Sequence, residues 1–253
     1  MIVLAIVSAK GGVGKTTVTA NLGAGIAARG HPVSLIDLDP QNSLQWHLGV
    51  VNRGHPKGIS SLLKARDKLD KVAINSPYGV NLIPFGIINE NQRQQFEQLL
   101  EQDELWLRRQ IERSAIPADS IVLLDTPPGP TVYLQQAIHA ADFLIVVVLA
   151  DAASYSTLPE MEELIATYGQ RQQMAIGSAY VVNQGAQRQL AQDVVALFAE
   201  RLGKRMVPFV VSESAEVEEA LAHEKPVILY RPENPAAQSL QSIIDWLLSG
   251  LQK

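Results

Sequence analysis

The sequence contains no cysteine among its 253 residues. Disulfide bonds, thiolate zinc sites, iron–sulfur clusters and cysteine nucleophiles are therefore excluded. No stretch approaches the roughly 18 apolar residues that a transmembrane helix requires, so we expect none. The apolar start, MIVLAIVSA, is short and has no basic leader. We interpret it as a buried first strand rather than a signal peptide.

Charged residues are also scarce, and acids slightly outnumber bases. They make up 19% of the chain, against 47% hydrophobic residues, and the formal net charge is −5. This balance is typical of a soluble globular protein with a sizeable core. It argues against a broad basic face for nucleic acid or anionic lipid, although it leaves room for a local basic patch.

Short apolar runs alternate with helical patterns along the chain, which predicts an α/β fold with a mostly parallel sheet. The runs are continuously apolar, as expected for strands that helices cover on both faces. We predict strands at 2–8, 33–37, 121–125, 143–149 and 176–182, with weaker candidates at 80–84, 206–209 and 226–230. The helical patterns fall at 15–29, 91–114, 156–168, 187–202 and 236–251.

The length alone allows one domain or two. Because no linker, repeat or low-complexity tract interrupts the chain, we predict a single domain over residues 1–253. The stretch 46–79 is the least regular, and we expect short helices and loops there. Trp106 is a large apolar residue in the polar stretch 91–114. It either marks a docking surface or packs on the domain's own sheet.

Residues 8–17 read SAKGGVGKTT and lie between a predicted strand and a predicted helix, the context of a phosphate-binding loop. Glycines let the backbone approach the phosphates and turn its N–H groups toward them. Lys15 is expected to contact the β- and γ-phosphates, Thr16 to ligate Mg²⁺, and Thr17 to reach the α-phosphate. The predicted nucleotide-binding residues are Lys10, Gly11, Gly12, Val13, Gly14, Lys15, Thr16 and Thr17.

Hydrolysis of a bound nucleotide also needs acidic groups, and two predicted strands end in them. Asp37 ends the segment LID and Asp39 follows two residues later, whereas Asp125 ends the run IVLLD. Asp125 fits an acid that holds Mg²⁺ directly or through water. A lone aspartate after a strand is more often a turn former, so the assignment depends on the glycine loop upstream.

The glycine loop departs from the general pattern GxxxxGK[ST] at Ala9 and carries an additional lysine, Lys10. In this respect KGGVGKTT resembles the deviant Walker A motif of the ParA/MinD ATPases. The resemblance implies a P-loop NTPase three-layer sandwich that binds ATP and Mg²⁺. It also implies that Lys10 reaches the nucleotide of a partner subunit in an ATP-dependent homodimer. By the same resemblance Asp39 activates the attacking water, and Asp37 lies near the metal.

The resemblance extends to the base of the nucleotide. Family members hold adenine with an Asn after a late strand and with backbone after a following strand. Asn183 and the segment Val207–Phe209 match in order and context. Asn183 is therefore expected to pair with the adenine edge, and Pro208 or Phe209 to lie against the ring.

Several branches of the family fit poorly. The iron–sulfur members need cysteines, and MinD-like proteins carry a basic C-terminal helix that lies on membrane. Here residues 239–253 contain only Asp245 and Lys253 as charged side chains, so we expect a helix that packs on the core without membrane insertion. ParA-type DNA partitioning stays open as an alternative, through the candidate basic residues Arg188, Arg201, Lys204, Arg205 and Arg231.

Three stretches resemble the BcsQ family of cellulose biosynthesis proteins: 37–49, 81–86 and 220–240. This resemblance implies a cytoplasmic dimer that serves the cellulose secretion machine at the inner membrane. Its partners would be the small protein BcsR and other Bcs subunits. A non-enzymatic assembly subunit that binds ATP as a structural cofactor is a further alternative.

Overall fold

The computed structural model describes residues 1–50, 57–64, 67–169 and 176–251. Lys253, one of the two charged residues of the segment 239–253, lies outside these ranges. A seven-stranded sheet runs through the chain in the order β3-β4-β2-β5-β1-β6-β7. All neighbouring strands are parallel except the short pair β3 and β4. The strands are β1 (Ile2–Val7), β2 (Val33–Asp37), β3 (Ile74–Asn75), β4 (Asn81–Ile83), β5 (Ile121–Asp125), β6 (Phe143–Leu149) and β7 (Gly177–Asn183).

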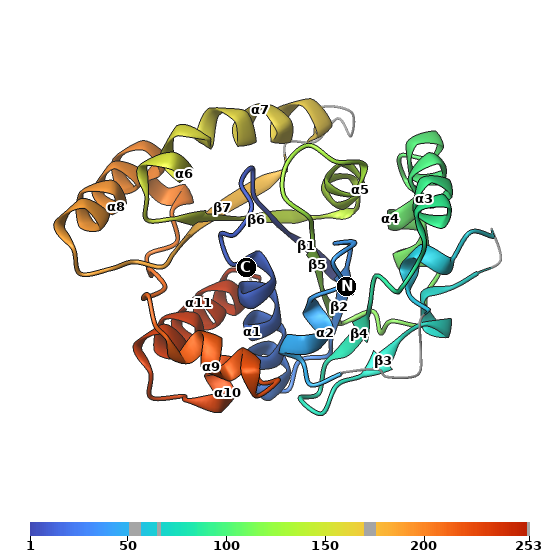
Figure 1. The fold of residues 1–253 in the computed structure, drawn as a ribbon, viewed down its shortest axis with the longest axis horizontal. Helices are drawn as coiled ribbons and strands as arrows, with labels where there is room; N and C mark the ends of the chain where they lie inside the picture. The colour runs from blue at the N-terminus through green and yellow to red at the C-terminus, as the bar shows by residue number, and fades with distance from the viewer. Residues whose placement is uncertain (51–56, 65–66, 170–175, 252–253) are drawn as a thin grey trace.

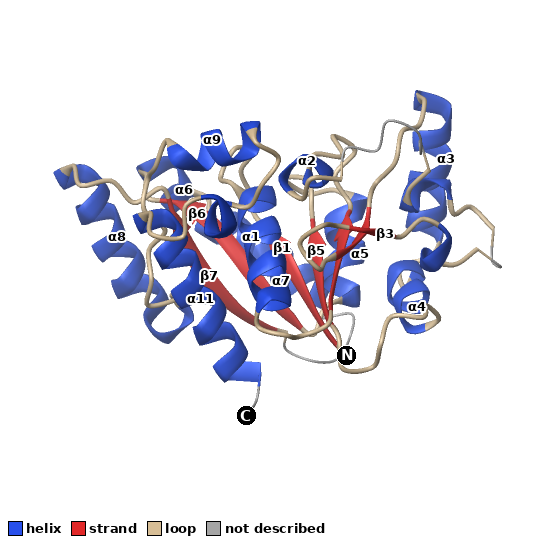
Figure 2. Cartoon of the chain, turned by 90° about the horizontal axis from the view of Figure 1, so that it is seen from below, coloured by secondary structure: helices blue, strands red, loops and turns tan. Residues whose placement is uncertain are grey.

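Helices cover both faces of this sheet and make three layers (Figures 1 and 2). One face carries α1 (Lys15–Ala28), α2 (Leu44–His47), α9 (Glu216–Ala222), α10 (Val227–Tyr230) and α11 (Pro235–Leu251). The other carries α3 (Glu90–Gln102), α4 (Trp106–Glu112), α5 (Val132–Ala140), α6 (Ala152–Ser156), α7 (Leu158–Gly169) and α8 (Gln189–Leu202). The predicted α/β three-layer sandwich is thus confirmed.

The alternation of side chains along β1 explains why the strands are apolar throughout. Val3, Ala5 and Val7 face the core under α3 to α8, whereas Leu4 and Ile6 face the core under α1 and α11. Successive side chains of a strand point to opposite faces, so a strand between two helical layers needs an apolar residue at every position. The predicted helix over 236–251 is present as α11 and packs on the core, with Leu240, Ile243, Ile244 and Leu247 buried and Leu248 partly buried.

The predicted helix over 91–114 is wrong as a single helix, because it breaks at Asp103 into α3 and α4. The side chain of Gln136 on α5 forms hydrogen bonds with the polar backbone groups at the break. Its Nε2 donates to the carbonyl oxygens of Leu100 (2.9 Å) and Asp103 (2.6 Å), and its Oε1 accepts from Leu107 N–H (3.0 Å). Apolar side chains of both helices are buried on either side of the break: Phe96, Leu100, Leu107 and Ile111. Trp106 is buried against Phe96, which rules out the docking surface suggested for it.

Two weak strand predictions are also wrong. Residues 206–209 follow the edge of β7, where Val207 N–H donates to Tyr180 O, but Pro208 has no N–H to continue a ladder. Residues 226–230 form the short helix α10 after Pro226, and Ile228 N–H donates to the side chain of Asn21 on α1. The apolar run there packs on α1 and α11 and never reaches the sheet.

The irregular stretch after β2 holds short helical turns, η1 (Ile59–Ser61) and η2 (Leu69–Lys71), together with β3. This agrees with the prediction for 46–79, except that its parts at 51–56 and 65–66 lie outside the described residues. In the part of the chain that the structure describes, no helix is both long and apolar enough to cross a membrane.

Candidate functional site

The glycine loop joins the carboxyl end of β1 to the first turn of α1. Gly12 and Gly14 have φ values of 74° and 86°, in the left-handed region that favours glycine. A Cβ atom on Gly14 would clash with the side-chain Nδ2 of Asn183, and the φ of 86° would be strained for a residue with a side chain. The N–H groups at the start of α1 are available to an anion, as at other helix N-termini.

Lys15 is the buried cation of this loop. It is 7% exposed, and its Nζ donates to Ser8 Oγ at 2.8 Å. Ser8 Oγ in turn donates to the carbonyl oxygen of Lys10 at 2.7 Å. Burial lowers the pKa of Lys15, and the nearby Asp125 and Asp39 carboxylates oppose that effect. The ammonium group is therefore held near two acids but lacks a full countercharge of its own.

Asp125 ends β5 and is completely buried. The Thr19 hydroxyl donates to its Oδ1 at 3.0 Å, and the Thr16 hydroxyl lies close enough to the carboxylate to lower its pKa. Its Oδ2 is buried and accepts no hydrogen bond from the described residues. Burial raises the pKa of Asp125 to about 6. A buried carboxylate oxygen without a donor suits a divalent cation or a water bound to one, so the residues here fit Mg²⁺.

Within the described ranges no three acidic or histidine side chains gather into a metal site. Mg²⁺ would thus need phosphate oxygens and water to complete its ligands beside Asp125 and Thr16, as is usual for this ion. Asp37 lies opposite Asp125 in the register of β2 and β5. Burial and the charge of Asp125 raise the pKa of Asp37 well above its ordinary value.

Asp37 also shapes the loop that holds Asp39. Its Oδ1 accepts from Asp39 N–H (2.9 Å) and its Oδ2 from Leu44 N–H (3.1 Å). Asp39 is half-buried, and its own carboxylate accepts from Gln41 N–H at 2.9 Å. Both oxygens of Asp37 are therefore used by backbone, which suits an indirect role near the metal.

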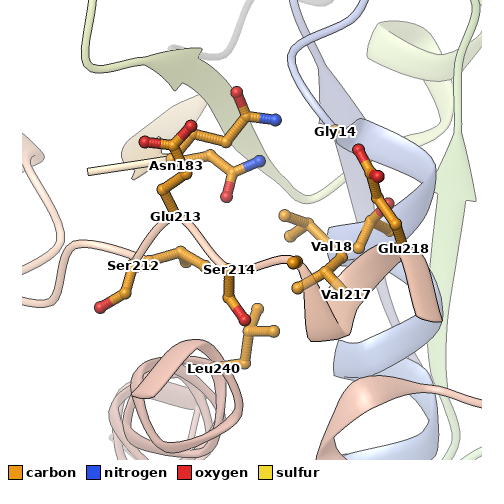
Figure 3. Close-up of a pocket in the computed structure, with 13 residues that line it drawn as sticks. Gly14, Val18, Asn183, Ser212, Glu213, Ser214, Val217, Glu218 and Leu240 are labelled. Atoms are coloured by element: carbon orange, nitrogen blue, oxygen red, sulfur yellow. The ribbon is translucent and has the colours of Figure 1, made fainter. Parts of the chain in front are cut away.

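A pocket of about 350 Å³ opens beside the glycine loop, between β7 and α9 (Figure 3). Gly14, Thr17 and Asn183 line one side, and the segment Val211–Ala215 lines another. Asn183 is buried, and its Nδ2 donates to Val13 O at 2.8 Å. Pro208 and Phe209 are exposed and are not among the lining residues. The contact of Pro208 or Phe209 with the adenine ring therefore stays a prediction, and the segment after them lines the pocket.

Lys10 lies at the rim of the site. Its Nζ pairs with Asp151 Oδ2 at 3.2 Å, and both side chains are about one-third exposed (36% and 35%). Asp151 is the N-cap of α6, where its Oδ1 accepts from Ser154 N–H at 2.6 Å. Within one chain Lys10 thus points at α6.

Three comparisons with known proteins agree with this geometry. A family model described as "Cellulose biosynthesis protein BcsQ" matches residues 1–248. The chain belongs to the BcsQ family. This BcsQ-family chain is 30% identical over 243 residues to an uncharacterized ATP-binding protein of Methanocaldococcus jannaschii, covering 96% of this chain and 86% of that protein. It is 26% identical over 242 residues to the sporulation initiation inhibitor protein Soj of Bacillus subtilis, covering 93% and 94%.

Solved structures share the fold. The septum site-determining protein MinD of Pyrococcus horikoshii, complexed with Mg-ADP, aligns with a TM-score of 0.76 at 22% identity, covering 100% of this chain and 98% of MinD. An ATP complex of McdA from Cyanothece aligns with a TM-score of 0.83 at 19% identity, covering 98% and 96%. The relatives by sequence include a chromosome-partitioning ATPase, so the BcsQ-family chain is an ATPase of the ParA/MinD type.

The structure thus gathers Lys15, Thr16, Asp37, Asp39 and Asp125 at one edge of the sheet. Sequence reasoning missed Ser8 and Asp151, which hold the two loop lysines. Asp151 lies two residues beyond the predicted strand 143–149, just as Asp39 lies two residues beyond the predicted strand 33–37. The position of an acid just beyond a parallel strand was therefore a signal available in the sequence.

Proposed function

We propose that this BcsQ-family chain is a slowly hydrolysing MgATPase that dimerises when ATP is bound and then assembles or localises a bacterial cellulose synthesis complex. The observation that carries the proposal is the meeting of Lys15, Asp125 and Asp39 beside the glycine loop. The family match supplies the link to cellulose.

The residues divide the chemical work by their position. MgATP, when bound, supplies the γ-phosphoryl group and the metal charge. Lys15 neutralises charge on the phosphates, Thr16 and Asp125 hold the metal, and Asp39 orients the attacking water. Asp37 keeps the Asp39 loop in place. Because phosphoryl transfer needs mostly positioning and countercharge, a subunit without a partner's Lys10 is expected to hydrolyse ATP slowly.

The direction of one hydrogen bond supports ATP over GTP. Val13 O can only accept, so the group that Asn183 presents to it must be the Nδ2 donor. This leaves Oδ1 of Asn183 as an acceptor beside the pocket. An acceptor suits the amino group of adenine and opposes the carbonyl oxygen of guanine.

The cellulose role is tested in the host organism. In a strain that lacks the gene, the wild-type chain should restore cellulose secretion, and a Lys15→Ala variant expressed at the same level should not. A tagged wild-type chain should also retain BcsR and other Bcs subunits during purification. Full restoration by Lys15→Ala would contradict a need for ATP binding, both in the proposed function and in the alternative of an assembly subunit that binds ATP as a structural cofactor.

DNA partitioning is the second candidate, because several relatives are named chromosome-partitioning proteins. Of the candidate basic residues, Arg201 and Arg205 both pair with Glu162, which reduces the charge they offer to phosphate. DNA binding that requires ATP and weakens steeply with added salt would favour partitioning over cellulose assembly. Under the proposed cellulose function, the chain would be recruited to the inner membrane or the cell pole by binding to its Bcs partners.

A further inference from the structure

The loop that holds Asp39 is attached to the neighbouring strand through one buried side chain, Asn42. Asn42 is only 8% exposed. Its Oδ1 accepts hydrogen bonds from Phe85 N–H (3.0 Å) and Gly86 N–H (3.3 Å), just beyond β4. Its own N–H donates to the carbonyl oxygen of Asp39 at 2.8 Å. Asn42 therefore links Asp39 to the end of β4 by a short chain of hydrogen bonds.

The backbone of Asn42 adds a second requirement. Its φ is 52°, in the left-handed region that asparagine tolerates better than most residues with a side chain. The position thus needs both this backbone conformation and a short side chain with an acceptor oxygen. Glycine meets only the first need, whereas aspartate meets both.

The point of attachment is itself firmly held. Ile59 N–H donates to Pro84 O at 2.9 Å, and Ser60 Oγ donates to Phe85 O at 2.6 Å. Phe85 is 1% exposed, and its ring packs edge-on against Tyr133 of α5. The backbone of Phe85, to which Asn42 is hydrogen-bonded, is therefore part of the core rather than a free loop.

The other end of the loop is held by Asp37, through the N–H groups of Asp39 and Leu44. That attachment fixes the loop to β2 but does not fix its tip toward β4. Among the described residues, Asn42 is the loop side chain that makes this lateral connection. Without it, the tip over residues 39–42 keeps the anchorage from β2 and the hydrogen bond from Gln45 Nε2 to Asn42 O (3.1 Å), neither of which reaches β4.

We infer that Asn42 is a positioning residue for ATP hydrolysis. Its two accepted hydrogen bonds hold the loop so that the Asp39 carboxylate stays where the attacking water must lie. The inference rests on the proposed function, because that function assigns the water to Asp39. Displacement of a catalytic group by about 1 Å can lower a rate by roughly 100-fold, so a loosened loop should affect turnover far more than nucleotide binding.

The test compares Asn42→Gly with Asn42→Asp in the full chain. The glycine variant keeps the backbone conformation and removes the acceptor, so kcat should fall at least about tenfold. Its Kd for MgATP should stay within about twofold of the wild type. The aspartate variant restores an acceptor and should keep kcat within about threefold. Amide hydrogen exchange of Phe85 and Gly86 should accelerate in the glycine variant only.

Glu224→Gly is the matched control, because Glu224 also has a positive φ of 55° and its backbone oxygen accepts from Tyr78 Oη, not from the loop over residues 39–42. It should leave kcat and the exchange of Phe85 and Gly86 unchanged. An unchanged kcat in Asn42→Gly would overturn the inference, and so would an equal loss of ATP affinity, which would mark Asn42 as part of the binding site's fold. If Asn42→Gly proves too unstable, an Asn42→Asp variant that loses turnover overturns it on its own.

The outcomes separate this inference from the proposed function. An active wild type with a fully active Asn42→Gly refutes the role of Asn42 alone. A wild-type chain that binds no MgATP refutes the proposed function, and the role of Asn42 falls with it.

Discussion

At the scale of single residues, buried charge is concentrated where three strands end. Lys15, Asp37 and Asp125 are all less than a tenth exposed, and they lie within electrostatic reach of one another. Burying charges that are not fully paired costs stability, and proteins keep such groups where a ligand will complete them. The spacing in KGGVGKTT and the acids after the strands predicted these positions. The hydrogen bonds of Asn42 and Asp151 could not be predicted, because each depends on which distant segment packs beside it.

The role of Lys15 is tested by nucleotide binding. Replacing Lys15 with alanine removes the buried cation that faces the phosphates, so the Kd for MgATP should rise by about 100-fold or more. Isothermal titration calorimetry measures this directly. Lys10→Ala is the matched control, since it removes the other loop lysine and should still bind ATP as a monomer. Unchanged affinity in Lys15→Ala would contradict the role assigned to it.

The stability of the nucleotide-free chain should depend on pH through Asp125. Its pKa is raised from 3.8 to about 6, so the folded chain holds this proton more tightly than the unfolded chain. Its contribution to stability is therefore full below about pH 4 and is lost as the pH rises to about 6. In Mg²⁺-free buffer, Asp125→Asn should raise the melting temperature at pH 7.5 by on the order of 5 °C.

The gain in melting temperature from Asp125→Asn should shrink toward zero below about pH 4, where Asp125 is largely protonated in both the folded and the unfolded wild-type chain. Differential scanning calorimetry at several pH values measures it. A gain that does not vary with pH would mean that Asp125 is ionised in the apo chain throughout this range.

At the scale of elements, apolar runs predicted the five long strands because those strands are buried on both faces. The same signal failed at 226–230, where an equally apolar run packs as the helix α10 against α1 and α11. Periodicity cannot separate a short buried strand from a short buried helix. It failed again at Asp103, because the break between α3 and α4 is stabilised by Gln136, which lies more than thirty residues later.

Gln136 should therefore contribute to the stability of the fold and have little effect on ATP hydrolysis. Replacing it with alanine leaves two buried carbonyl oxygens and the Leu107 N–H without their partner, so the free energy of unfolding should fall by about 3 kcal/mol. Urea denaturation measures this fall, and ATP turnover per folded molecule should be unchanged. Gln135→Ala is the control, since the half-buried side chain of this neighbour makes a single hydrogen bond to the described residues, to Glu104. Equal effects of the two substitutions would contradict the assignment.

At the scale of the whole molecule, Lys10 forms an ion pair within its own chain, although the family resemblance implies that it contacts the nucleotide of a partner subunit. The ion pair with Asp151 must open before Lys10 can reach another subunit. A pair this exposed contributes about 0.2–1 kcal/mol, so it is a weak restraint on dimerisation. The number of subunits is a property that no pattern within one chain displays, and only the resemblance predicts it.

Asp151→Asn should release that restraint. The dimer dissociation constant in MgATP should fall by up to about thirtyfold, because one exposed ion pair in each of the two subunits no longer has to open. Sedimentation velocity over a range of concentrations measures it. Asp245→Asn is the matched control, since it breaks a surface ion pair with Arg29 on α1. A weaker dimer in Asp151→Asn would mean that Asp151 supports the dimer instead of competing with it.

The central claim is that ATP, through Lys10, joins two copies of this chain, and the molar mass in solution tests it most directly. Light scattering after size exclusion should give the mass of a monomer, 27.6 kDa, with MgADP and twice that mass with MgATP. Asp39→Ala should bind ATP and remain a dimer because hydrolysis is blocked, whereas Lys10→Ala should remain a monomer. An Asp39→Ala chain that binds MgATP yet keeps the monomer mass would contradict the account.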